Sequence, residues 1–467
     1  MSTIIQLLIV LGIMVLVHEF GHFAVAKLCG IRVEVFSIGF GKRLFGFRRG
    51  ETEYQIAAIP LGGYVKMSGE SFQPVGQPTD GSAANAVDAA NDPGSFNNHP
   101  RWQRMLVAFA GPIANFILAL GLMTGVSMLH NEVQEFLDGP AITDYIQSKT
   151  PAAKAGIRSG DLIVHFDTVE NPTWDDIGNR SVLNLNQTVP FSFVHDGQRT
   201  DTKLFIESKG SPDDFSIDQI GFVPKMQQTP VQVSSLEPNM PASRAGLKPG
   251  DKILTIDGLQ LHSVPALLSY LQDQAGKPAS LTIQRTAANG TVQTQPIQVT
   301  PELAETPGGT KDYRLGFVAV LPPVRVERLP FGKAMAASWQ FNKKGSLFIV
   351  EVIKRLFTRQ VSVKSLQSPI GIGQQIHQAA QMPGWMPLIG TMSLISLNLG
   401  ILNLMPIPIL DGGLILFLII ETIMRRDVNQ QIKERIYQVA FVCILAFFAF
   451  VIFNDLTRLN LFTKLKP

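Results

Sequence analysis

Residues 4–26 read IIQLLIVLGIMVLVHEFGHFAVA, and this stretch decides the architecture of the chain. As a helix, about 23 residues extend about 34 Å, which is enough to cross the hydrocarbon core of a bilayer. His18, Glu19 and His22 nevertheless interrupt the apolar run. The stretch lacks a basic start and a small-residue cleavage pattern, so we expect a retained membrane helix rather than a cleaved signal peptide.

The composition of the whole chain agrees with a membrane protein. Of 467 residues, 45% are hydrophobic and 16% are charged, whereas soluble proteins carry about 25% charged residues. The mean hydropathy is +0.17. These values exclude a disordered chain, a coiled coil and an ordinary soluble enzyme. The net charge of +3 is too small to indicate nucleic-acid binding, and only Cys29 and Cys443 are present, which excludes a disulfide-built fold.

Three further apolar stretches run from Met105 to Leu129, from Met386 to Ile423 and from Tyr437 to Phe453. The stretch from Met386 to Ile423, the third of the four in the chain, contains a proline-rich break between Asn403 and Asp411. A broken helix survives at membrane depth only where protein or a cavity satisfies the freed backbone groups, so the break itself indicates a site. The sequence thus predicts a polytopic α-helical membrane protein with four transmembrane helices.

Lysine and arginine near the span ends predict the orientation. The segment after the first span and the link after the third are both basic, through Lys27, Arg32, Lys42, Arg43, Arg48, Arg49, Lys66, Arg101, Arg104, Arg425, Arg426, Lys433 and Arg435. Both should be cytoplasmic, which places the long region between spans two and three outside.

Residues 33–67 alternate apolar and polar side chains, with glycines between the runs, and this pattern is typical of β-hairpins. Residues 71–98 contain no lysine or arginine and are predicted to form a flexible loop.

The outer region contains an internal repeat. The segment 151–163, PAAKAGIRSGDLI, matches 241–253, PASRAGLKPGDKI, at a constant offset of 90 with seven of thirteen positions identical. This pattern resembles PDZ domains, and each copy is followed by a Gly-Phe strand, at Gly221-Phe222 and at Gly316-Phe317. In the PDZ resemblance that strand edge and its pocket bind a peptide by strand addition. A spacer that only limits access by size is an equally good interpretation.

His18-Glu19-Phe20-Gly21-His22 is an H-E-x-x-H pattern. On a helix, residues i and i+4 share a face, so both imidazoles can bind one metal ion while Glu19 takes a proton from water. A catalytic zinc usually has three protein ligands, and Asp411 in the broken third stretch is the candidate for the third. Taken alone, Asp411 is better interpreted as a cap of the helix that follows the break, and only its pairing with the H-E-x-x-H pattern favours a ligand.

Together these motifs resemble the site-2 proteases, the intramembrane zinc metalloproteases, and most closely the bacterial members with tandem PDZ domains that act in sigma-E regulation. The resemblance covers nearly the whole chain and rests on HEFGH at 18–22, on Gly111-Pro112-Ile-Ala-Asn115-Phe116, on the stretch from Asn398 to Gly413, and on the double PDZ insert. It implies His18, His22 and Asp411 as zinc ligands and Glu19 as general base. It also implies a membrane-associated β region after the first span and a substrate-holding role for Asn403.

The resemblance further implies what the enzyme acts on. We expect cleavage of a transmembrane segment in a single-span regulatory protein of the anti-sigma-factor type, in an envelope stress response at the bacterial inner membrane, and possible action on remnant signal peptides. The PDZ domains would be periplasmic, and the active site would lie toward the cytoplasm. Two other classes stay open: a catalytically inactive PDZ-bearing adaptor, which the intact Glu19 opposes, and a membrane metal transporter, which would require more ionisable residues in several spans.

The predicted domains follow from these elements. They are 1–129 with the first two spans and the hairpins, 130–226 and 227–322 as the PDZ-like domains, 323–385 as a connecting segment, and 386–467 with the last two spans. Within the connecting segment, Phe331–Arg359 alternates apolar and basic residues. It is predicted to be an amphipathic helix, lying either on the outer leaflet of the membrane lipid or against the second PDZ-like domain.

Overall fold

A computed structural model describes residues 3–69, 92–133, 135–208, 215–286, 290–305, 311–320, 325–358, 369–382 and 384–458. The chain forms two compact units, which are described separately. The first comprises residues 1–131, 327–354 and 362–467, and the second comprises 132–326 with 355–361. The finer five-part division predicted from the sequence stays a prediction.

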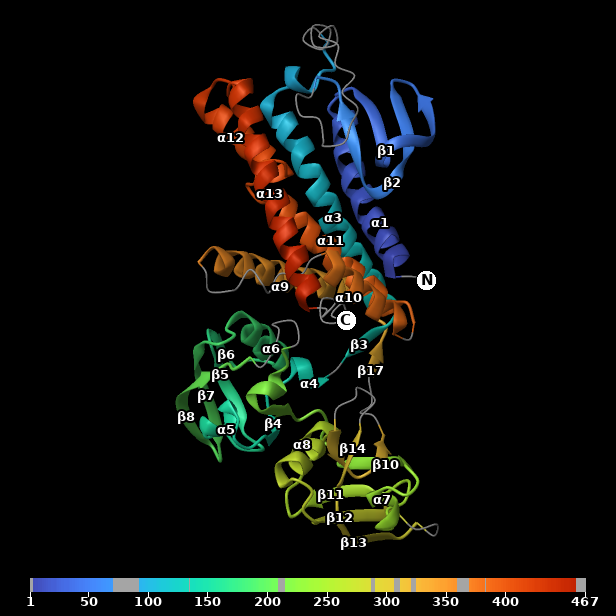
Figure 1. Cartoon of the computed structure of the whole chain (residues 1–467), viewed down its shortest axis with the longest axis vertical. Coiled ribbons are helices and arrows are strands. Elements are labelled where there is room, and N and C mark those ends of the chain that lie inside the picture. The colour runs from blue at the N-terminus through green and yellow to red at the C-terminus, as the bar shows by residue number, and fades with distance from the viewer. Residues whose placement is uncertain are drawn as a thin grey trace, which may run out of the picture. The chain divides into compact units, whose positions relative to one another are not determined.

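Four described helices are long and apolar enough to cross a membrane (Figure 1). They are α1 (Thr3–Leu28), α3 (Arg101–Leu129), α11 (Met386–Asn403) and α13 (Gln430–Arg458). The predicted break in the third stretch is present, because α11 ends at Asn403 and α12 (Asp411–Met424) begins only after an irregular turn. The last helix begins earlier than predicted, so Lys433 and Arg435 lie on its first turns rather than in the link.

Helix α3 packs against α1, α11 and α12 and forms the centre of the first unit (Figure 1). Small residues allow this close approach. A Cβ atom at Gly21 of α1 would lie 2.4 Å from the carbonyl oxygen of Ala110 on α3, and one at Gly400 of α11 would lie 3.1 Å from that of Pro112. Side chains of α1, α10 (Pro369–Gln381) and α11, including Met14, Ile376 and Met392, form an apolar cluster beside this core.

The hairpin region predicted at 33–67 is present as β1 (Val33–Arg49) and β2 (Thr52–Met67). These long strands bend, so that Val35 faces both Glu53 and Lys66, and residues 33–38 lie between the two halves of β2. The hairpin packs on α1 through Phe23, Phe36 and Tyr54, whose rings are in contact. A short η1 helix (Phe96–Asn98) follows in the described chain, whereas residues 71–91 of the predicted loop lie outside the described residues.

The amphipathic helix predicted at 331–359 is confirmed as α9 (Phe331–Phe357). In the first unit it packs against α3, where the Ser338 hydroxyl donates a 2.8 Å hydrogen bond to the carbonyl of Leu120. The large side chains of Phe331, Trp339 and Leu347 are exposed. Strands β3 (Asn131–Val133) and β17 (Arg325–Glu327) pair with each other.

The second unit contains the two repeats. The first has α4 (Glu135–Asp138), β4 (Thr143–Ile146), α5 (Pro151–Lys154), β5 (Leu162–Phe166), β6 (Val169–Glu170), α6 (Trp174–Leu183), β7 (Thr188–His195), β8 (Gln198–Phe205), η3 (Ile217–Ile220) and β9 (Phe222–Pro224). The second has β10 (Val231–Leu236), α7 (Pro241–Arg244), β11 (Lys252–Ile256), α8 (Val264–Gln274), β12 (Ala279–Thr286), β13 (Val292–Val299), β14 (Glu302–Glu305), β15 (Lys311–Arg314) and β16 (Phe317–Ala319).

The sequence repeat has a common structural cause. In each copy the aspartate of the Gly-Asp pair closes the turn before a strand, since the backbone amides of Arg158 and Lys248 donate 2.8 Å hydrogen bonds to Asp161 and Asp251. Both aspartates are buried. A buried carboxylate that satisfies a turn amide cannot be replaced cheaply, and this explains the shared motif.

The two repeats are joined by polar contacts along α8. Asp144 of β4, 1% exposed, accepts hydrogen bonds from the backbone amide of His262 and from the hydroxyl of Ser263. At the other end of α8, Asp273 accepts bonds from the hydroxyls of Tyr145 and Ser148. The repeats therefore form one unit.

Candidate metal centre

Helix α1 brings His18 and His22 together on one face, as their i, i+4 spacing predicts. Their Nε2 atoms are 3.2 Å apart and both residues are buried, at 7% and 9% exposure. The Nδ1 atom of His22 donates a 2.7 Å hydrogen bond to the carbonyl of Val107 on α3. This bond fixes the ring and leaves Nε2 as the nitrogen with a lone pair available to a metal.

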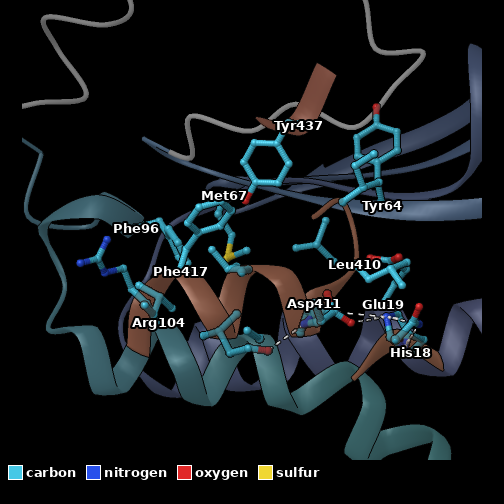
Figure 2. Close-up of a pocket in the computed structure, with 18 of the residues that line it drawn as sticks. His18, Glu19, Tyr64, Met67, Phe96, Arg104, Leu410, Asp411, Phe417 and Tyr437 are labelled. Atoms are coloured by element: carbon cyan, nitrogen blue, oxygen red, sulfur yellow. Dashed lines mark hydrogen bonds and ion pairs between the residues drawn. The ribbon is translucent and has the colours of Figure 1, made fainter. Parts of the chain in front are cut away.

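Asp411 completes a cluster with the two histidines, although it lies far away in the sequence. Its Oδ2 is 3.1 Å from His18 Nε2 and its Oδ1 is 3.4 Å from His22 Nε2. One ligand atom from each of the three residues lies within 4.8 Å of the others, the only such group among the described residues. Figure 2 shows Asp411 pointing toward His18.

The turn before α12 delivers Asp411 to this position. Ile409 has φ 91°, a conformation that β-branched residues rarely adopt and that costs about 1–3 kcal/mol. The turn folds tightly over the helix start, because a Cβ atom at Gly412 would lie 2.3 Å from the carbonyl oxygen of Leu404. Asp411 is thus the first residue of a helix whose entry is strained and densely packed.

Two asparagines contact His18. The fully buried Asn115 of α3 places Nδ2 3.1 Å from His18 Nδ1, while its own Oδ1 has no partner among the described residues. Turning this amide over would let Oδ1 accept the Nδ1 proton, which leaves the Nε2 lone pair for a metal. Asn403, at the end of α11, places Nδ2 3.3 Å from His18 Nε2. The contact of Asn115 with His18 joins α3 to α1.

Helix α3 makes room for both rings at Gly111. A Cβ atom there would lie 2.3 Å from His22 Nε2 and 2.7 Å from His18 Cε1. Only glycine therefore lets α3 approach the imidazoles this closely. The sequence motif around Gly111 contained this residue without indicating why it matters.

Glu19 projects beside the cluster into a cavity of about 580 Å³. The β2 segment around Gly63, Tyr64 and Val65 lines the same cavity, and the Glu19 carboxylate accepts a backbone hydrogen bond at Val65. Figure 2 shows Tyr64 and Leu410 near Glu19, with Met67, Phe96, Phe417 and Tyr437 farther along the cavity toward Arg104. The cavity is therefore long and largely apolar, with ionisable groups at both ends.

The predicted peptide-binding residues lie in the repeats of the second unit. Gly221 has φ 101° and ends η3, and Phe222 follows in β9, with its side chain in the core of the first repeat. Gly316 has φ 77° and precedes Phe317 in β16, an edge strand of a five-stranded sheet. Phe222 borders a second cavity of about 630 Å³.

The comparisons with known proteins agree with this arrangement. Residues 6–447 match the family model of peptidase family M50. The regulator of sigma-E protease RseP of Escherichia coli is 34% identical over 97% of this chain and 98% of its own length. Protease RseP of Yersinia pestis and a protein of Vibrio cholerae, whose name calls it a zinc metalloprotease, are each 32% identical over 97% of this chain and 98% of theirs.

The apolar helices and the cluster of two histidines, an aspartate and a neighbouring glutamate define a membrane metalloprotease. With the family match over most of its length, the chain belongs to peptidase family M50, the site-2 proteases. The resemblance drawn from the sequence is therefore confirmed.

Proposed function

We propose that the chain is an intramembrane zinc endopeptidase that cuts a transmembrane segment of a single-span regulatory protein. The observation that carries this proposal is the cluster of His18, His22 and Asp411 beside Glu19, at the end of a cavity between membrane-type helices. Charged and polar side chains at membrane depth are costly unless they serve a purpose.

The side chains present fit a zinc ion. Two imidazoles and one carboxylate are a usual protein ligand set of catalytic zinc, which keeps a further position open. Asp411 Oδ2 is buried and faces His18 Nε2 at 3.1 Å, so two atoms of metal-ligand type converge as expected of a site arranged for a cation. Zinc held by these three residues would supply a Lewis acid for a peptide carbonyl and make a water molecule more acidic.

Glu19 moves the proton in this scheme. Its carboxylate accepts a proton from the attacking water and returns it to the nitrogen of the leaving amine. The hydrogen bonds of His22 to Val107 and of His18 to Asn115 keep both imidazoles in a fixed orientation while this happens.

The substrate must be extended at the scissile bond, because in a helix each carbonyl group already accepts a hydrogen bond from a backbone amide. The edge segment 62–67 of β2 borders the cavity and could add a substrate strand next to Glu19. Asn403, beside His18, is placed to bind a freed backbone group of the substrate. Pairing with β2 and binding by Asn403 would together hold the unwound substrate segment against the catalytic groups.

The proposed location is the bacterial inner membrane with four spans. Basic residues follow α1 and α12, so the metal centre would lie toward the cytoplasm and the PDZ-like repeats would be periplasmic. Helix α9, which packs on α3 near Leu120 and exposes large apolar side chains, would lie on the outer leaflet.

The repeats would control which proteins reach the membrane. Strands β9 and β16, with Gly221-Phe222 and Gly316-Phe317, could bind a peptide or protein end, and the cavity beside Phe222 supports this role for the first repeat. Restriction of access by size remains the second candidate. The relative named as a regulator of sigma-E protease supports an anti-sigma-factor type of substrate and a role in envelope stress, with remnant signal peptides as further substrates.

A cleavage assay tests the proposal. The purified full-length protein is incubated with a single-span model peptide, with and without a chelator, beside the Glu19→Gln variant. We expect cleavage that a chelator abolishes, that zinc restores, and that Glu19→Gln lacks although it retains zinc. Cutting that persists in the variant would refute the mechanism. An inactive adaptor predicts no cleavage by either protein, and a transporter predicts metal flux into vesicles.

A further inference from the structure

The end of the cavity opposite the metal centre contains two unpaired polar atoms. Arg104 on α3 is 8% exposed, and its Nε has no hydrogen-bond partner among the described residues. Glu421 on α12 is fully buried, and its Oε2 likewise has no partner there. Both residues line the cavity that contains Glu19 and Asp411. Figure 2 shows Arg104 at the far side of the cavity from His18.

Buried polar atoms without partners are uncommon, because they lose their hydrogen bonds to water and gain none in return. Glu421 already uses its other oxygen, since Oε1 accepts from the backbone amide of Val428 at 3.1 Å and from Lys433 Nζ at 2.5 Å. These contacts explain why the carboxylate is held at this place. They leave Arg104 Nε and Glu421 Oε2 without a hydrogen-bond partner among the described residues, in side chains that line the cavity wall.

The charges at this end favour a neutral ligand. Four charged side chains line it, namely Arg104, Lys433, Glu421 and Glu434, and their formal charges cancel. An added cation would oppose two positive groups, and an added carboxylate would bring an acceptor next to the open acceptor of Glu421. An amide carries both a donor and an acceptor without net charge, so it can satisfy both open atoms.

The spacing fits a peptide that passes through the metal centre. Arg104 lies seven residues before Gly111, which contacts both imidazoles, so the helical rise separates them by about 10 Å. Glu421 lies ten residues after Asp411, or about 15 Å along α12. An extended chain advances about 3.3 Å per residue, so these distances correspond to three to five substrate residues.

We propose that Arg104 and Glu421 form a specificity subsite that binds an amide group of the substrate three to five residues from the scissile bond. The amide is either an asparagine or glutamine side chain or a main-chain group freed by unwinding. The inference rests on the proposed protease function, because it concerns how the same cavity binds its substrate. Arg104 acts by positioning this substrate segment and takes no part in the proton transfers of Glu19.

The test uses single-span peptides in which glutamine replaces one leucine at a time, with the cleavage position read by mass spectrometry. For the wild-type protein we expect kcat/KM to rise about threefold to tenfold when glutamine lies three to five residues from the cut bond. Arg104→Met and Arg104→Lys should lose this preference. Arg101→Met is the matched control, because Arg101 lies one turn away, pairs with Asp427 and does not line the cavity.

A second arm distinguishes the two sources of the amide. Replacing one peptide bond at the same distance by an ester removes the main-chain donor, which should lower wild-type cleavage severalfold and leave the Arg104 variants unaffected if the main chain is bound. Preference for glutamine, or this ester effect, supports the subsite when it depends on Arg104. The subsite is overturned if the Arg104 variants lose neither the glutamine preference nor the ester effect. It is also overturned if Arg101→Met and Arg104→Met change these effects equally.

Binding separates this inference from the protease proposal. Peptide affinity is measured by fluorescence anisotropy on full-length Glu19→Gln, with and without Arg104→Met, after zinc content and helicity show that each variant is folded. If the wild-type protein cuts nothing, the protease proposal fails. The affinity difference between glutamine and leucine peptides would still support or overturn the subsite.

Discussion

Replacing Gly111 by alanine should disable the metal centre without unfolding the protein. The added Cβ would lie 2.3 Å from His22 Nε2 and 2.7 Å from His18 Cε1, whereas ordinary contacts begin at 3.4 Å. The rings or the α3 backbone must therefore move by about 1 Å to relieve the clash. His22 cannot move freely, because its Nδ1 is hydrogen-bonded to the carbonyl of Val107, which lies on α3 like Gly111.

A shift of this size is large on the scale of metal coordination. Ligand atoms must keep their distances to within about 0.2 Å, so a displacement of about 1 Å removes an imidazole from the coordination sphere. Loss of groups that only orient ligands already costs about 10- to 100-fold in metal affinity. We expect Gly111→Ala to lose at least 100-fold in zinc affinity and to lose proteolysis with it.

The assay is zinc affinity in detergent, measured by competition with a chromophoric chelator, with circular dichroism as a check on helicity. Gly121→Ala is the matched control, because Gly121 lies on the same helix and a Cβ there meets nothing within 4 Å. The control should bind zinc like the wild type and be slightly more stable, since alanine favours a helix over glycine. Wild-type zinc affinity in Gly111→Ala would refute the proposed packing of α3 against the imidazoles.

The remaining predictions address other contacts. Asn115→Ala removes the hydrogen bond to His18, so zinc affinity should fall about 10- to 100-fold in the same competition assay. Burial and a hydrogen bond to Asp257 raise the pKa of Tyr270 to about 12; its contribution to stability should therefore be complete below pH about 10 and be lost as the pH rises through about 12. Tyr270→Phe should remove that part of alkaline unfolding, followed by tyrosinate absorbance. Asp144→Ala leaves buried donors unpaired between the repeats and should cost about 3 kcal/mol, measured by chemical unfolding against an exposed aspartate variant.

Local rules account for the part of the centre that the sequence predicted. His18 and His22 share a face because the helix period places i and i+4 together, and the apolar neighbours predicted a helix long enough to span a membrane, as α1 is. Asp411 required a different argument, because it lies in another helix. The break after Asn403 indicated that α12 begins at a special place, and the structure brings Asp411 within 3.1 Å of His18.

The contacts that support the centre could not be predicted in the same way. Gly111 and Val107 act through the distance between two helices, which depends on packing along their whole length. The contact of Asn115 with His18 likewise depends on the register of α3 against α1, which no local pattern encodes. Such partners become visible only when the helices are placed together.

The charge pattern that predicts the orientation was misleading about where the last helix begins. Lys433 counted as part of a basic link, yet it lies on the first turns of α13 and pairs with the buried Glu421. A lysine that neutralises a buried carboxylate can extend a helix beyond the apolar stretch, because burial of the acid requires a nearby cation. Hydropathy alone therefore placed the start of this helix too late.

The same reasoning links the two ends of the cavity. At one end, ligand atoms of His18, His22 and Asp411 converge to within 4.8 Å of one another. At the other, Arg104 and Glu421 are held by the scaffold with one open atom each. Stability alone would select against both, because each could be replaced by apolar groups at lower cost. Converging ligand atoms at one end of an apolar cavity and unpartnered polar atoms at the other are therefore best explained by a single extended ligand, whose backbone reaches from the catalytic groups to the charged end.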